Sequence, residues 1–83
     1  MATEIAPFLA EFSKHADCWY ASVRPDGRPH IAPIWFVFVD NAVWMMTTPK
    51  AVRAQNLATS DRASVAAPDT KSPFIMEGRS ERV

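Results

Sequence analysis

The sequence contains a single cysteine, Cys18, so no disulfide within the chain can stabilise the fold. Its nine basic and nine acidic side chains cancel, and a net charge of zero gives no reason to expect a nucleic acid or an anionic membrane as a partner. No stretch approaches the roughly 20 consecutive apolar residues that cross a membrane. We therefore expect neither nucleic acid nor membrane among its partners.

The sequence also lacks the groupings that bind metals, direct export or mark a nucleophile. His15 and His30 have no partner at metal-ligand spacing, and Cys18 has no second thiol, so no metal site is predicted. The first twelve residues contain acids and no long apolar run, unlike a secretory signal, which favours a cytoplasmic location. No nucleophile motif surrounds Ser22 or Ser64, and the catalytic residues are unknown at this stage.

Apolar side chains are abundant instead, at 48% of the 83 residues, with three tryptophans and five phenylalanines. A chain of this length makes one domain, residues 1–83, and buries only roughly 60% of the surface that its unfolded form exposes. Its own core is therefore small. Because no disulfide supports it, we expect a second copy of the chain to contribute stability.

Apolar residues at helical spacing predict an N-terminal helix within residues 1–16, namely Ile5, Phe8, Leu9, Phe12 and Ala16. Proline fits only the first turn of a helix, so this helix should begin near Ala6 or Pro7 and end near residues 15–17. Residues 17–83 then read as strands with one further helix at about 49–59. The order is helix, three strands, helix, two strands, which is a small mostly-β barrel with attached helices.

Two turns separate the first three predicted strands, at Pro25-Asp26-Gly27 and at Asp40-Asn41. The second turn is two residues long, which predicts a tight hairpin. Its register would form four cross-strand pairs: Val39 with Ala42, Val37 with Trp44, Trp35 with Met46, and Pro33 with Thr48.

The second predicted strand, residues 29–39, is apolar on both faces. A strand with one solvated face would alternate polar and apolar residues. One face should therefore fill the barrel, while the other needs a cover from a helix or another subunit. The N-terminal helix alone is the simpler alternative cover.

The segment TTPKAVRAQN carries the strongest local signal for a ligand. With Thr48 as N-cap and Pro49 as the first helical residue, Lys50 and Arg53 lie in or beside a first turn that holds no acid. Cations are mildly unfavourable there, and a bound phosphate would resolve the conflict. The alternative is that both side chains are simply solvated.

The ordered series DGRPH, PIWF, TT, RxxNL, DRASV and EGR resembles the pyridoxamine 5′-phosphate oxidase-like flavin-binding proteins, over about residues 16–83. The resemblance is greatest to the small bacterial branch that uses FMN or a deazaflavin. It implies a mostly β fold, an antiparallel split β-barrel of the FMN-binding type. It also implies a homodimer with flavin at the subunit interface.

Carried over residue by residue, the resemblance implies two groups of cofactor-binding residues. The flavin ring would lie along Ala32, Pro33, Ile34 and Trp35, largely through their backbone. The phosphate would be held by Thr47, Thr48 and Arg53, with Lys50 as an extra cation. Many relatives have a Ser-x-Lys pair where this chain has Ala51 and Arg53.

The function implied is that of an oxidoreductase that binds FMN, or a deazaflavin, and transfers hydride to or from a small-molecule substrate. The alternatives are a non-catalytic module that binds flavin or haem, and a dimerising barrel without cofactor. Relatives continue well past Val83, so we expect either a barrel truncated at its C-terminus or a minimal version closed by its partner.

Overall fold

The computed structural model describes residues 6–83, so Ile5 of the predicted helical face lies outside the described residues. Two short helices and six strands follow one another along the chain: α1 (Ala6–Phe12), β1 (Asp17–Val23), β2 (Pro29–Trp35), β3 (Val37–Val39), β4 (Ala42–Trp44), α2 (Val52–Asn56), β5 (Arg62–Ala66) and β6 (Ile75–Arg79). Neither described helix is long and apolar enough to cross a membrane.

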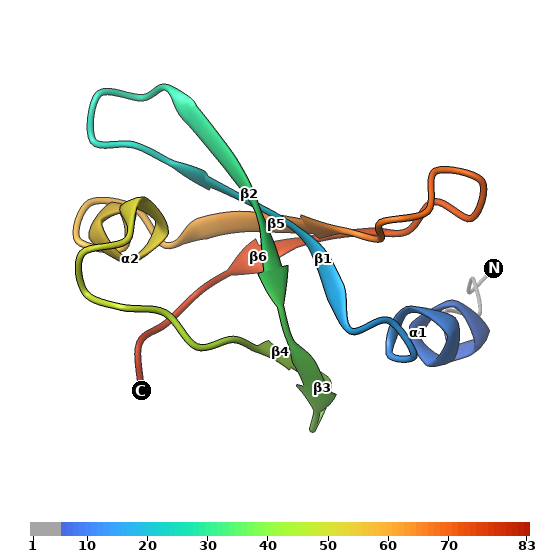
Figure 1. Cartoon of the computed structure of the whole chain (residues 1–83). Helices are drawn as coiled ribbons and strands as arrows, with labels where there is room; N and C mark the ends of the chain where they lie inside the picture. The colour runs from blue at the N-terminus through green and yellow to red at the C-terminus, as the bar shows by residue number, and fades with distance from the viewer. Residues whose placement is uncertain (1–5) are drawn as a thin grey trace, which may run out of the picture.

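All strand pairs are antiparallel. One sheet has the order β2-β1-β5-β6, and β3 pairs with β4 in a separate two-stranded sheet. Figure 1 shows β2 and β1 crossing the β5–β6 pair, with the β3–β4 hairpin below them and α2 to the left of the strands. The mostly β architecture with attached helices is as the sequence predicts.

The two predicted turns are confirmed. Gly27 has a φ of 91°, and Asp26 accepts hydrogen bonds from the backbone N–H and Nε of Arg28 at 3.1 and 2.7 Å. These bonds hold the pKa of Asp26 below its ordinary value. Asp40 and Asn41 have φ values of 54° and 58°, the left-handed pair that a type I′ hairpin requires.

The hairpin register is confirmed near the turn and wrong further from it. Val39 pairs with Ala42 and Val37 with Trp44, but β4 ends at Trp44, and the pairs Trp35–Met46 and Pro33–Thr48 do not form. Trp35 and Pro33 instead lie opposite Asp17 and Trp19 of β1. The strand breaks at Phe36, whose ring is buried and whose N–H bonds the carbonyl of Ala16.

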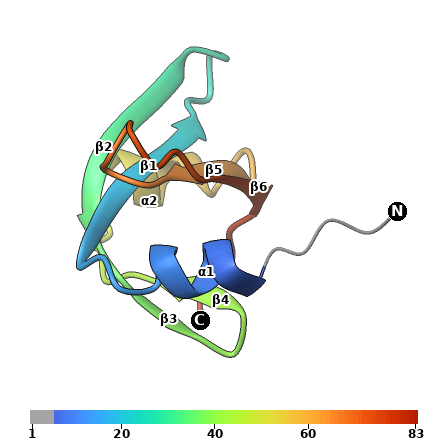
Figure 2. The ribbon, with the colours of Figure 1, turned by 90° about the vertical axis from the view of Figure 1, so that its right-hand side faces the viewer.

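The core lies between the inner face of the curved sheet and α1. Phe12 stacks on Phe36, with ring centroids 4.8 Å apart, and also contacts Phe38 and Phe74. Figure 2 shows α1 on the concave side of the sheet, between β5–β6 and the β3–β4 hairpin. The helix therefore covers the inner face, and the idea that it covers the other face of β2 is wrong.

Both helices are shorter than predicted. α1 begins at Ala6 as expected but ends at Phe12, because Lys14 and His15 make tighter bonds three residues back. α2 spans only Val52–Asn56 instead of about 49–59, and a series of turns continues it to residue 59.

The N-cap of α2 is Ala51, with an extended backbone and no side-chain cap, and not Thr48. The carbonyl of Thr48 accepts the N–H of Ala51 at 3.0 Å and so closes a turn over Pro49 and Lys50. Lys50 therefore lies before the helix, while Arg53 is within its first turn.

Candidate functional site

Strand β2 forms an open edge of the four-stranded sheet, because among the described residues β1 is its only neighbour in that sheet. Residues of an antiparallel pair alternate between hydrogen-bonded and non-bonded positions. At one end of the β1–β2 pair the N–H of Arg24 bonds the carbonyl of Arg28, and at the other end the N–H of Phe36 bonds the carbonyl of Ala16. These two bonds show which residue pairs are the hydrogen-bonded ones. The even residues of β2 therefore bond to β1, and the odd residues direct their backbone groups to the open edge.

This alternation separates the four residues expected to line the ring. Ala32 and Ile34 use their backbone groups toward β1, opposite Tyr20 and Cys18. Trp35 offers both its N–H and its C=O at the edge. Pro33 offers only a C=O, because proline has no N–H, and an open edge is the position where that lack costs least.

The side chains of β2 divide in the same way. Ile34 is buried at 4% exposure, whereas Trp35 is 85% exposed and Ile31 62%. Val37 of β3 is also exposed on this outer side. Both faces are apolar, as the sequence indicates, but only the inner face is covered within the chain. An apolar surface thus lies beside the open backbone edge.

The expected phosphate residues lie on the segment that joins β4 to α2 and on α2 itself. Thr47, Thr48 and Lys50 are exposed. Arg53 is half-buried, and its Nε is fully buried without a hydrogen-bond partner among residues 6–83. A buried N–H without a partner needs a physical explanation.

A polar contact holds α2 against β1. Asn56, only 1% exposed, donates its amide Nδ2–H to the hydroxyl of Ser22 at 2.9 Å. His30 lies opposite Ser22 on the neighbouring strand, and its buried Nδ1 has no partner within the described residues. Sequence reasoning assigned no role to Asn56, because Arg53 and Gln55 beside it are also polar and nothing local marks it as the buried one.

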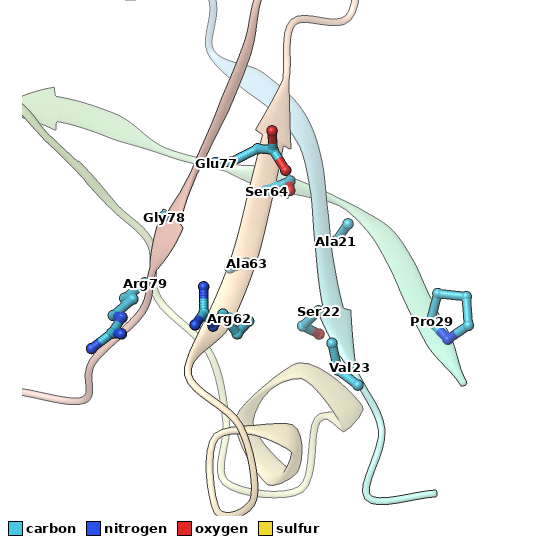
Figure 3. Close-up of a pocket in the computed structure, with 10 residues that line it drawn as sticks. All are labelled: Ala21, Ser22, Val23, Pro29, Arg62, Ala63, Ser64, Glu77, Gly78 and Arg79. Carbon is cyan, nitrogen blue, oxygen red and sulfur yellow. The ribbon is translucent and has the colours of Figure 1, made fainter. Parts of the chain in front are cut away.

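Two hollows share residues with these features, since Ser22 lines the first and Thr47 the second. The first has a volume of about 410 Å³. Figure 3 shows Arg62 and Arg79 opposite each other on β5 and β6, with Glu77 and Ser64 beyond them. Arg79 approaches Asp61 at 3.9 Å, and both side chains are more than half exposed. Such pairs contribute about 0–1 kcal/mol, so we assign this hollow no role in the site.

The larger hollow is a groove of about 940 Å³ between residues 41–49 and the end of the chain. Tyr20 forms part of its lining, and its hydroxyl shares a 2.7 Å hydrogen bond with that of Ser80. Of the eight expected cofactor residues, only Thr47 lines this groove. The groove is also lined by Pro49 and Ala54, so it adjoins the segment that carries Lys50 and Arg53, whereas no residue of β2 lines it.

The sequence model of pyridoxamine 5′-phosphate oxidase matches residues 1–83, the whole chain. The chain belongs to this family. The predicted family and the split β-barrel fold of its members are thereby confirmed. No curated protein sequence matches significantly.

Two solved structures share the fold of this family member. A conserved hypothetical protein from Mycobacterium tuberculosis, Rv2991, superposes with a TM-score of 0.81 at 26% identity, over 95% of this chain and 53% of its own. The haem storage protein HutZ from Vibrio cholerae superposes with a TM-score of 0.73 at 19% identity, over 96% of this chain and 66% of its own. The chain thus spans roughly half to two thirds of the structures it resembles.

Among residues 6–83, no three or more His, Cys, Asp and Glu side chains gather as they would around a metal ion. Burial, with a smaller contribution from Asp17, raises the pKa of Cys18 to about 11, so this thiol is a poor nucleophile at neutral pH. Among residues 6–83, the polar groups left without protein partners include the open backbone edge of β2 and the Nε of Arg53.

Proposed function

We propose that this chain is part of a flavin-dependent oxidoreductase that binds FMN, with a deazaflavin as the alternative cofactor. The observation that carries the proposal is the open edge of β2, where backbone groups of Pro33 and Trp35 are free beside an exposed apolar surface. Membership of the pyridoxamine 5′-phosphate oxidase family supports it.

The edge of β2 suits the ring of a flavin chemically. The pyrimidine end of that ring carries a carbonyl acceptor beside an N–H donor, and the N–H and C=O of one extended residue complement this pair. Trp35 offers both groups on the same side of the strand, with Pro33 adding one acceptor. The apolar side chains of Ile31 and Trp35 would exclude water from the ring.

The segment at residues 47–53 suits the phosphate. Arg53 brings a half-buried guanidinium whose Nε is covered by the protein, so its terminal amino groups are the donors that a phosphate would accept. Lys50 and the hydroxyls of Thr47 and Thr48 are exposed and available beside it.

When bound, the flavin supplies the hydride chemistry, and the protein supplies binding, orientation and exclusion of water. The other reactant is a small molecule. We further propose a cytoplasmic location.

We also propose that the outer face of β2 and β3 is covered by a second copy of the chain, with the flavin between the two. Trp35, Ile31 and Val37 stay exposed in one chain, and α1 is engaged on the opposite side of the sheet. Light scattering at micromolar concentration should give the mass of a dimer, and Trp35→Glu should give a monomer. A wild-type chain that scatters as a monomer contradicts this part of the proposal.

The visible absorption spectrum of the purified protein tests the cofactor. We expect a flavin spectrum, native or after addition of FMN or deazaflavin, that bleaches with a reduced nicotinamide. A Soret band would favour the haem-binding module, since HutZ, which has this fold, is a haem storage protein. A colourless protein that gains no thermal protection from either flavin would contradict both.

Substituting Lys50 and Arg53 together by Ala tests the phosphate site. We expect FMN affinity to fall by at least about tenfold, because two charged hydrogen-bond donors are lost. The matched control replaces Lys71 and Arg82 by Ala, because both are exposed cations that lie outside residues 47–53. Equal FMN affinity in both double variants would refute the assignment.

A further inference from the structure

The short helix α2 has little to fix its orientation by itself. It spans five residues, has no side-chain cap, and its single buried residue is Asn56. Helices this short are not stable alone, so their position is set by tertiary contacts. The side-chain bond from Asn56 to Ser22 joins residues 34 positions apart and is the buried polar contact between α2 and the sheet.

Arg53 and Asn56 are three residues apart and therefore lie on the same side of α2. The side chain of Arg53 therefore starts on the face of α2 that Asn56 directs toward β1, which is consistent with the burial of its Nε. A rotation of α2 that broke the bond to Ser22 would also move Arg53.

We propose that Ser22 and Asn56 are positioning residues, whose hydrogen bond orients Arg53 for an anionic ligand. This rests on the proposed function for the identity of the ligand, a flavin phosphate, and on the geometry of α2 for the orientation itself. Ser22 is 5% exposed and on the inner face of β1, so it acts through Asn56 and Arg53.

The NMR signal of the Arg53 Nε–H in the full chain tests the orientation without any flavin. In the wild type we expect a resolved signal protected from exchange, because the group is buried. In Ser22→Ala the signal should move to the chemical shift of exposed arginines, and its protection factor against exchange should fall at least about tenfold. In Ser22→Thr, which keeps the hydroxyl, it should stay in place.

Two further variants complete the comparison. Gln55→Ala is the control, since Gln55 is on the same helix but bonds only the carbonyl of Lys50 at an exposed site, and it should leave the Arg53 signal unchanged. Ser22→Cys replaces the oxygen by a weak acceptor of similar shape and substitutes for Ser22→Ala if that variant does not fold. An unchanged Arg53 signal in the folded variant overturns the proposal.

Affinities for FMN and for riboflavin, which lacks the phosphate, provide the second readout. Ser22→Ala should weaken FMN about tenfold and riboflavin less than about twofold, because only FMN uses Arg53. An equal loss for both ligands would mean that Ser22 merely supports the fold, and would overturn the proposal. If the wild type binds neither ligand, the proposed function fails, and the Arg53 signal alone decides whether Ser22 and Asn56 position that side chain.

Discussion

The two helices of this protein are held in place by opposite kinds of contact. Each ends in a residue that is 1% exposed, Phe12 in α1 and Asn56 in α2. Phe12 enters a cluster of aromatic rings, whereas Asn56 makes one hydrogen bond to a serine. The apolar contact is the centre of the core, while the polar contact is the one that we propose to orient Arg53.

The difference follows from the physics of the two interactions. Burial of an aromatic ring is strong but tolerates shifts in orientation, since many neighbours can supply contacts. A hydrogen bond contributes less net free energy but requires one partner at one distance and angle. We therefore expect the α1 end to dominate stability and the α2 end to dominate ligand specificity.

The largest effect should come from breaking the apolar end. Phe12→Ala should lower the free energy of unfolding by about 3–5 kcal/mol, because it leaves a cavity among Phe36, Phe38 and Phe74. Phe12→Leu, the control, keeps a large apolar side chain at this position and should lower the free energy of unfolding by under about 1.5 kcal/mol. Urea denaturation measures both, and a loss below that of Ser22→Ala would reverse the comparison.

Breaking the polar end should have a smaller effect on stability. Ser22→Ala should lower the free energy of unfolding by about 1–3 kcal/mol, since it leaves the amide of Asn56 buried without an acceptor. Replacing both partners, with Asn56→Leu added, should cost less than the sum of the single changes. Strict additivity in this double-mutant cycle would show that the two side chains are not coupled.

The smallest effect is a pH dependence confined to the apolar end, where Cys18 packs in the same cluster as Phe12. Burial raises the pKa of Cys18 from 9.0 to about 11, so the folded protein keeps the thiol proton in a range where the unfolded chain loses it. The contribution of this thiol to the free energy of unfolding is fully present below pH 9 and is lost toward pH 11. At pH 10 the loss is about 1 kcal/mol.

Urea denaturation at pH 8 and pH 10 checks this, with Cys18→Ala as the reference for other groups that titrate in the range. The alkaline loss should be smaller in the reference by about 1 kcal/mol. A reference that loses as much as the wild type would show that Cys18 does not contribute.

Much of the fold was predictable because its signals are local. The type I′ hairpin at Asp40-Asn41 and the turn at Gly27 need residues that accept positive φ, and the sequence provides them at those positions. The two apolar faces of residues 29–39 also appear as expected. The start of α1 follows from the tolerance of a first turn for Pro7.

The candidate site was predictable only in part. Thr48 and Pro49 have the chemistry of a helix start, yet the helix begins after Ala51, because a turn closed by the Thr48 carbonyl takes their place. The distinction among the four β2 residues was also out of reach, since it depends on which of them bond to β1. The contribution of Asn56 requires knowing that Ser22, 34 residues away, lies beside it.

The sequence by itself determined the family, the mostly β class, the turns and the apolar character of both faces of β2, because periodicity and turn chemistry act between near neighbours. Only the tertiary structure decided where the long second strand breaks, which backbone groups stay open at its edge, and which side chain holds α2. Those outcomes depend on which strands become neighbours in space. The packing of Phe12 on Phe36 and Phe74, which lie far apart along the chain, is a contact of this kind.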